Sequence, residues 1–97
     1  MAQVGFSGAA LKDFERIHAF YAQESIDLAI AQAHALHQAI SILGAHPLIG
    51  RVVRSGLREL VISQGKTGFL ALYRHLPQHD LVWVLRIRHQ RELGYGA

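Results

Sequence analysis

The apolar residues of this chain change their spacing once, around the segment Gly44-Ala45-His46-Pro47. On the N-terminal side they recur at the intervals of an amphipathic helix. On the C-terminal side they form short runs rich in β-branched and aromatic residues, which is typical of strands. Helices that precede the strands, instead of alternating with them, predict an α+β domain.

The N-terminal half of the chain predicts two helices. The first covers residues 8–23, and the second runs from Ile26 to Leu43. Gly44 ends the second helix, because glycine readily adopts the conformation that follows a helix, and Pro47 cannot continue it. The link at Gln23-Glu24 is so short that the two helices should form an antiparallel hairpin.

Each predicted helix has a serine in position to cap it, Ser7 for the first and Ser25 for the second. Each also has an apolar stripe along one side. The stripes consist of Leu11, Phe14, Ile17, His18 and Tyr21 in the first helix, and of Ile26, Ala29, Ile30, Ala33, Leu36 or His37, Ile40 and Leu43 in the second. The charged residues between the stripe positions of the first helix are expected on its polar side; they are Lys12, Asp13, Glu15 and Arg16.

The C-terminal half predicts three strands, at Leu57–Ser63, Phe69–Leu76 and Leu81–Arg88. Turn residues separate these strands, so they should form an antiparallel meander. Gln3–Phe6 is a candidate fourth strand. The predicted order is β-α-α-β-β-β in a single domain of residues 1–97, with the helical hairpin packed on one face of a small, mostly antiparallel sheet.

Composition excludes several classes of protein. The chain has no cysteine, which rules out disulfides, thiolate metal sites and cysteine nucleophiles. Met1–Phe6 lacks the features of a signal peptide, and no apolar run approaches the ~20 residues that span a bilayer. We therefore expect a cytoplasmic protein without a membrane partner. Hydrophobic residues make up 51% of the chain, which is high for this length, so part of the apolar surface is expected to need a partner.

Positive charge is concentrated in the C-terminal half. Residues 51–97 contain eight lysines and arginines against Glu59, Asp80 and Glu92. A basic field of this kind favours an anionic partner, either a nucleic acid or an acidic protein. The alternative is a solvated face that happens to be basic.

The densest group of polar side chains follows the last predicted strand. Arg88, His89 and Arg91 lie within four residues, and Glu92 and Tyr95 come directly after. Arginines can bind phosphate while histidine or tyrosine moves protons, which is the chemistry of a metal-free ribonuclease that uses the 2′-hydroxyl of RNA as its nucleophile. The structural alternative is that Glu92 pairs with Arg91 or Arg88 and that Tyr95 packs over the end of the sheet.

Strand alternation predicts where the arginines point. In the last strand, Arg86 and Arg88 alternate with the set that contains Trp83, and Arg74 lies on the neighbouring strand. We expect the three arginines to gather on the sheet face away from the helices, and we expect Trp83 and Tyr73 in the core. The alternative is that these arginines are edge charges that prevent aggregation.

Two further patterns are better explained by local structure. Gly65-Lys66-Thr67-Gly68 lacks the glycine spacing of a phosphate-binding loop and indicates a hairpin turn. His34 with His37, and His75 with His79, are close enough in sequence to be metal ligands, but few carboxylates accompany them. We expect no metal and no cofactor.

Four segments occur in a characteristic order: LGAHPLIGR at 43–51, LRELVI at 57–62, GFLALYR at 68–74 and RHQRE at 88–92. Together with the leading strand and the helical hairpin, they resemble the RelE/ParE superfamily of type II toxin–antitoxin toxins over almost the whole chain. The fold of that superfamily is the one predicted above. The resemblance implies a growth-inhibiting toxin of a plasmid stabilisation module, held in a hetero-oligomer by a cognate antitoxin whose flexible C-terminal segment wraps the toxin.

The superfamily divides by target. RelE-like members are ribosome-dependent endonucleases that cut mRNA, and ParE-like members poison DNA gyrase without known nuclease chemistry. RelE-type toxins carry lysines on the first meander strand, where this chain has residues 58–62, and an arginine where this chain has Leu70. Arg91 and Tyr95 lie near the C-terminal arginine and tyrosine of the superfamily.

The leading hypothesis is therefore a ParE-like toxin that acts on DNA gyrase as a binding poison. The alternative is a RelE-like mRNA interferase that acts on the translating ribosome with its mRNA. Its candidate catalytic residues would be Arg58, Arg74, Arg88, His89, Arg91 and Tyr95. A third hypothesis is a non-toxic interaction module.

Overall fold

The computed structural model describes residues 1–64 and 67–90. Two long helices are followed by most of the strands, as the change in apolar spacing predicts. The elements are β1 (Gln3–Phe6), α1 (Gly8–Ala22), α2 (Ile26–Ser41), the 3₁₀ helix η1 (Ile42–Gly44), β2 (Arg51–Arg54), β3 (Leu57–Gln64), β4 (Thr67–Leu76), the 3₁₀ helix η2 (Pro77–His79) and β5 (Leu81–His89).

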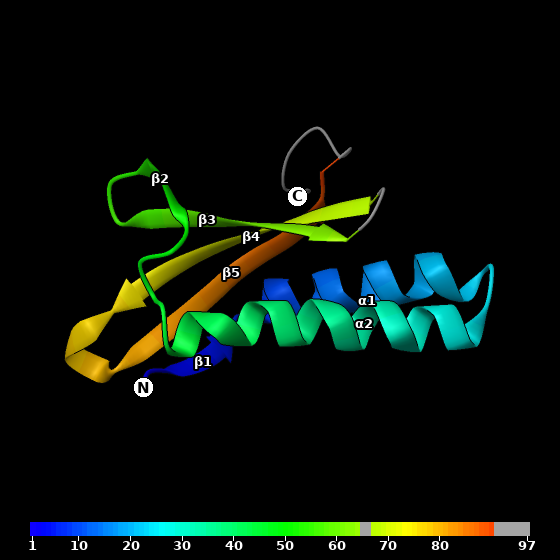
Figure 1. Ribbon diagram of the computed structural model, residues 1–97, viewed down its shortest axis with the longest axis horizontal. Helices are drawn as coiled ribbons and strands as arrows, with labels where there is room; N and C mark the ends of the chain where they lie inside the picture. Colours follow the sequence, from blue (N-terminus) through cyan, green and yellow to red (C-terminus); the bar gives the residue numbers. More distant parts are fainter. Residues whose placement is uncertain (65–66, 91–97) are drawn as a thin grey trace.

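The strands form one five-stranded sheet in the order β1-β5-β4-β3-β2. β3, β4 and β5 make the predicted antiparallel meander, and β1 joins the sheet by pairing in parallel with β5. β2 was not predicted; it is a short strand that pairs with β3. The predicted α+β fold, with a helical hairpin on one face of a mostly antiparallel sheet, is confirmed (Figure 1).

Both predicted N-caps are confirmed. Ala10 N–H donates to Ser7 Oγ at 3.0 Å at the start of α1, and Leu28 N–H donates to Ser25 Oγ at 3.2 Å at the start of α2. Each bond satisfies a backbone donor that the first turn of a helix leaves without a partner. The chain therefore enters both helices where the sequence indicates.

The core lies between the helical hairpin and the sheet. Its fully buried large side chains are Tyr73, Phe69, Leu36, Ile40, Leu43, Ile87, Val82 and Val84. The predicted stripes are only partly right, because Leu11, His18, Ile26 and Ile30 are exposed. Figure 1 shows the link between the helices beyond the ends of the strands, so residues near that link have no sheet to pack against.

The pairing of β4 with β5 contains a bulge at Leu85. Leu72 lies opposite Arg86 and Tyr73 lies opposite Val84, so one residue of β5 has no counterpart on β4. A bulge of this kind reverses the alternation of the strand beyond it. The faces predicted from strict alternation are therefore wrong for half of β5.

Val82 and Val84 before the bulge and Ile87 after it all point into the core, where each is fully buried. Trp83 was expected in the core with Tyr73. It is half-buried and lies on the opposite face from Val84, so that prediction is wrong, whereas Tyr73 is fully buried as expected.

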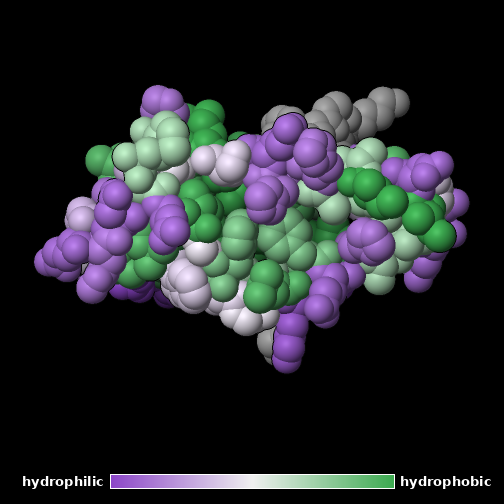
Figure 2. All heavy atoms as spheres, turned by 90° about the horizontal axis from the view of Figure 1, so that it is seen from below, coloured by the Kyte–Doolittle hydropathy of each residue, from purple (hydrophilic) through white to green (hydrophobic). Residues whose placement is uncertain are grey.

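Apolar side chains also reach the surface, as the composition led us to expect. Figure 2 shows hydrophobic groups exposed between hydrophilic ones on the face seen from below. The exposed large hydrophobic residues are Met1, Leu11, Phe20, Ile26, Ile30, Ile42, Leu48, Ile49, Val52, Val53 and Val61. Within the described residues, neither helix has the length and apolar character needed to cross a membrane.

Candidate functional site

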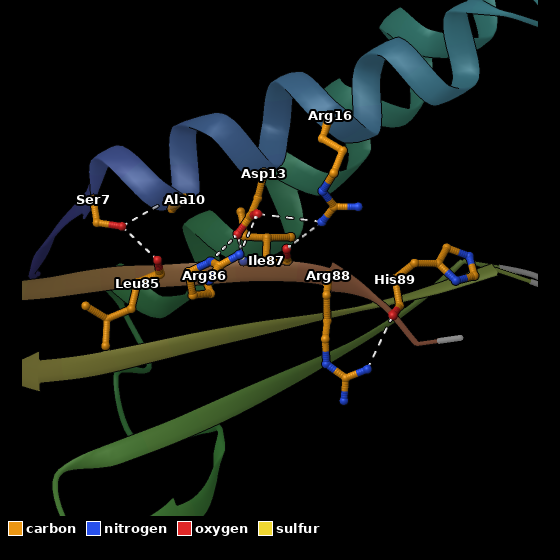
Figure 3. A network of polar contacts seen from close by, with 9 residues as sticks. All are labelled: Ser7, Ala10, Asp13, Arg16, Leu85, Arg86, Ile87, Arg88 and His89. Carbon is orange, nitrogen blue, oxygen red and sulfur yellow. Dashed lines mark hydrogen bonds and ion pairs between the residues drawn. The ribbon is translucent and has the colours of Figure 1, made fainter. Parts of the chain in front are cut away.

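Helix α1 covers the edge of β5 beyond the end of β1 (Figure 3). Ser7 Oγ donates to the carbonyl oxygen of Leu85 at 2.7 Å, and the backbone N–H of Ile87 donates to Asp13 Oδ2 at 2.8 Å. Arg16 Nη2 also reaches the carbonyl oxygen of Ile87, at 3.4 Å. Side chains of the helix thus take the place of a missing neighbouring strand, and we call this set of contacts the α1–β5 edge contact.

Asp13 is the charged centre of this contact. Its side chain is only 4% exposed, and it accepts hydrogen bonds from Arg86 Nε at 2.9 Å and Arg86 Nη2 at 3.2 Å. Arg16 lies 3.6 Å away as a second cation. Burial by itself raises the pKa of Asp13, but the hydrogen bonds from Arg86 and Ile87 and the two nearby positive charges outweigh it. The pKa therefore lies below the ordinary value of 3.8.

The lowered pKa of Asp13 makes the stability of the fold depend on pH. A carboxyl group whose pKa is lower in the folded state stabilises that state above its unfolded pKa of ~3.9, and the contribution is lost as the pH falls through the folded pKa. We expect Asp13→Asn to be less stable than the wild type by about 2 kcal/mol at neutral pH. We also expect the difference to shrink below about pH 4, which urea unfolding at several pH values can measure.

An equal loss for Asp13→Asn at neutral and strongly acidic pH would contradict this account. Glu15→Gln is the matched control, because Glu15 lies on the same helix and is exposed. We expect it to change the free energy of unfolding by less than about 0.5 kcal/mol at any pH.

Tyr73 and Arg58 hold the loop that connects η1 to β2. Gly50 N–H donates to the Tyr73 hydroxyl at 2.9 Å, and that hydroxyl donates to the carbonyl oxygen of Pro47 at 2.8 Å. Arg58 Nη1 donates to the carbonyl oxygens of Leu48 at 3.1 Å and Gly50 at 2.8 Å. The backbone approaches Tyr73 so closely that a side-chain carbon on Gly50 would lie 2.6 Å from the phenol oxygen. Glycine is therefore required at this position.

The environment of Tyr73 keeps its hydroxyl protonated. Burial raises the pKa of the phenol above 10.0, while the hydrogen bond from Gly50 and the charge of Arg58 oppose the shift without cancelling it. A protonated phenol can donate to one backbone group and accept from another at the same time. Tyr73 is thus a structural link between β4 and the loop.

The described candidate catalytic residues do not converge. Arg58 lies opposite Tyr73 and His89 lies opposite Phe69, so both are on the sheet face that packs on the helices, but their partners on β4 are four residues apart. His89 also meets Phe69 edge to face, with ring centroids 5.4 Å apart.

Arg74 and Arg88 lie on the other sheet face. Arg74 is opposite Trp83 and Arg88 is opposite Leu70. The two positions on β4 are therefore four residues apart, or roughly 14 Å along the strand at ~3.4 Å per residue. Figure 3 shows the Arg88 side chain pointing away from α1.

The expected gathering of Arg74, Arg86 and Arg88 occurs only in part. Their partners in the sheet place all three residues on the face away from the helices. The guanidinium of Arg86, however, bonds to Asp13 of α1 instead of joining the other two. The predicted position of Asp13 on the polar side of α1 is wrong, because this residue is buried.

Arg91 and Tyr95 lie outside the described residues, as does Glu92.

No set of three histidine, aspartate or glutamate side chains is placed to hold a metal ion within the described residues. The structural roles of Asp13 and Tyr73 were not found from sequence. For Asp13 there is no local signal, since its partner Arg86 is 73 positions away. For Tyr73 the segment Pro47–Gly50 is a weak signal, because a tight loop needs partners for its backbone groups, but Gly50 is 23 positions away in the sequence.

Comparison with known proteins assigns the family. Residues 4–94 match the family described as the ParE toxin of type II toxin-antitoxin system, parDE. The chain belongs to the ParE toxin family. It is also similar to Toxin RelE3 of Caulobacter vibrioides, with 37% identity over 71 residues that cover 73% of this chain and 67% of the relative. The protein is therefore a type II toxin–antitoxin toxin of the RelE/ParE superfamily, as the resemblance implied.

Chains of solved toxin–antitoxin systems share the fold of this family member. A chain of the chromosomal ParDE system from P. aeruginosa matches with a TM-score of 0.75 and 20% identity, covering 92% of this chain and 96% of that one. A chain of the E. coli RelBE toxin–antitoxin complex matches with a TM-score of 0.69 and 13% identity, covering 95% and 100%. At such low identity, these likenesses concern the fold alone.

Proposed function

We propose that this ParE-family toxin inhibits growth by binding DNA gyrase. The observation that carries the proposal is the dispersal of the described candidate catalytic residues over two faces of the sheet, at positions that differ by four residues along β4. General acid–base catalysis needs its groups within hydrogen-bond reach of one substrate. A binding poison has no such requirement, because its contacts can be spread over a surface.

The structural role of Arg58 further supports binding over catalysis. This arginine already donates to two loop carbonyls. An arginine that holds the backbone in place cannot turn to a phosphate without breaking those bonds. The match to the ParE family agrees with this proposal.

We also propose that a cognate antitoxin binds this toxin and suppresses it, within a module that stabilises a plasmid or a chromosomal region. The support is that several solved structures of similar fold are described as toxin–antitoxin systems or complexes. The exposed apolar residues of this chain are consistent with a surface that a partner covers.

Pulse labelling after induction of the toxin alone tests the target. We expect DNA synthesis to fail first while protein synthesis continues, and we expect the purified toxin to block supercoiling by gyrase. Early collapse of protein synthesis, with mRNA cut on ribosomes, would overturn the proposal. It would support the RelE-like alternative, which the similarity to Toxin RelE3 and the adjacency of Arg88 and His89 favour.

Substitutions at the end of β5 separate the same alternatives. His89→Phe keeps an aromatic ring against Phe69 but removes both nitrogens, and Arg88→Gln removes a charge. If the toxin acts by binding gyrase, we expect the double variant to inhibit growth within about twofold of the wild type, since neither residue is needed for proton transfer. A ribonuclease that used these residues would lose roughly 100-fold or more of its activity. The thermal midpoint of the double variant serves as the control for folding.

A further inference from the structure

Trp83 of β5 lies on the sheet face opposite to the one that packs on the helices. It pairs with Arg74 of β4, whereas the buried side chains of Tyr73 and Val84 on the same two strands point into the core. Trp83 is partly exposed. Tryptophan and arginine are enriched among the residues that contribute most to protein–protein binding. This pair on an outer face therefore favours contact with another protein.

The indole of Trp83 lies over Gly5 of β1. The two residues are partners in the sheet, and a side-chain carbon on Gly5 would lie 2.8 Å from Cζ3 and 2.9 Å from Cε3 of the ring. The ring therefore rests directly on the backbone of β1, in a space that the missing side chain leaves open. A ring held in this way loses little conformational entropy when a partner covers it.

Trp83 and Arg74 both keep hydrogen-bond donors available. Within the described residues, neither the indole N–H of Trp83 nor the guanidinium of Arg74 makes a hydrogen bond or an ion pair. Their direct pairing in the sheet brings their Cβ atoms to roughly 5 Å from each other. Both side chains donate and neither accepts, so the groups that complete them are acceptors from solvent or from another molecule.

Leu76 and Leu81 form the next pair on the same face, and both are partly exposed. We call the four residues Trp83, Arg74, Leu76 and Leu81 the Trp83 patch. Its apolar centre and its cation resemble the centre and the rim of a protein interface. The leucines cannot form hydrogen bonds with the edges of bases, and one available cation is few for binding a phosphate backbone. The patch therefore fits a protein better than a nucleic acid.

The charge around the patch indicates the chemistry of that protein. The five described strands contain six arginines, and their one carboxylate belongs to Glu59, which is buried and pairs with Arg51. Arg86 pairs with Asp13, but Arg74 is exposed without a counterion among the described residues. An acidic surface is electrostatically complementary to such a face.

We propose that the Trp83 patch is the surface through which this toxin binds gyrase, at a cleft of the enzyme that combines apolar side chains with carboxylates. The indole fills the apolar part of the cleft, and its N–H and the Arg74 guanidinium donate to acidic oxygens. The inference rests on the function proposed above and adds the contact surface to it. Arg88 pairs with Leu70, four residues from Arg74 along β4, so the patch does not include the end of β5.

Trp83 is the only tryptophan of the chain, so a label on tryptophan reports on the patch alone. The full-length toxin is labelled with 7-azatryptophan, which adds no atom to the ring and can be excited separately from the tryptophans of gyrase. We expect purified gyrase to protect this ring from quenching by acrylamide. Affinities of unlabelled variants follow from competition with the labelled toxin.

Arg74→Glu should weaken binding about tenfold, because an attraction at the rim becomes a repulsion. Trp83→Ala should weaken it roughly 30-fold or more, as expected of a central interface residue. Lys12→Glu, an equal charge reversal on the exposed side of α1, should leave the affinity unchanged. The thermal midpoint of each variant is the control for folding. Since Arg74 is exposed, its variant keeps the test valid if Trp83→Ala does not fold.

Gly5→Ala tests the position of the ring without removing it. The added carbon would displace the indole, so we expect weaker binding of gyrase. Gly8→Ala is the matched control, because a side-chain carbon there would have no described neighbour within 4 Å. It should bind as the wild type does.

The outcomes separate this inference from the proposed function. If gyrase binds the wild type and the Arg74 and Gly5 variants equally and leaves the ring open to acrylamide, the inference fails and the proposed function stands. If the wild type does not bind gyrase at all, both fail. Protection of the ring by duplex DNA alone would assign the patch to nucleic acid. Protection that grows with the concentration of free toxin would assign it to a second copy of the chain.

Discussion

Replacement of Asp13 by alanine is expected to lower the free energy of unfolding by about 3 kcal/mol, the largest loss we predict for a single charged residue. The substitution leaves the Arg86 guanidinium and the Ile87 N–H without the carboxylate that satisfies them in the α1–β5 edge contact. A buried polar group that loses its partner costs more than the bond itself contributed. Urea unfolding at neutral pH measures the loss.

Two further variants test the physical reason for this loss. Glu15→Ala removes an exposed carboxylate from the same helix and should cost less than about 0.5 kcal/mol. Asp13→Leu combined with Arg86→Met replaces the ion pair with apolar side chains and should recover part of the stability. Full recovery would contradict the role given to the Ile87 N–H, which still lacks an acceptor in that variant.

Tyr73→Phe is expected to cost about 2 kcal/mol, although it removes a single oxygen atom. The hydroxyl bonds to both Gly50 and Pro47, so its loss leaves a donor and an acceptor of the loop without a partner. We expect faster hydrogen exchange at Gly50 in the variant, together with a lower urea midpoint and an unchanged urea slope.

Tyr21→Phe is the matched control for this substitution. Tyr21 is also buried, but within the described residues its hydroxyl makes no hydrogen bond. Its loss should therefore change the free energy of unfolding by much less. Equal costs for the two variants would show that the Tyr73 hydroxyl does not hold the loop.

The parts of the fold that local chemistry determines could be predicted from sequence. Ser7 and Ser25 cap the two helices because a serine beside the first turn satisfies that turn's own backbone donors. The three meander strands follow from short apolar runs separated by turn residues. In each case the signal and the structure lie within a few residues of each other.

The parts that distant contacts determine could not be predicted. In the sequence, Asp13 lies among the other charged residues of α1 and looks like a surface residue. It is a buried hydrogen-bond acceptor only because β5 packs beside it. No residue of the apolar strand β5 signals a bulge at Leu85 in the sequence. The bulge nevertheless decides which face of the sheet Ile87 and Arg88 lie on. Arg58 has the residue type expected of a phosphate ligand, but the loop that folds over it supplies carbonyl oxygens first.

The edges of the sheet have a consequence for assembly. α1 covers β5 beyond the end of β1, and the backbone N–H of Ala2 bonds to the carbonyl oxygen of Gly44 in η1 beside β1. Within the described residues, no other element covers the outer side of the short strand β2, whereas the outer side of β1 lies beside η1. An open strand edge can pair with one further strand. Through β2 the chain can add one partner segment or pair with one other copy, whereas a continuous sheet of many chains would also require the outer edge of β1.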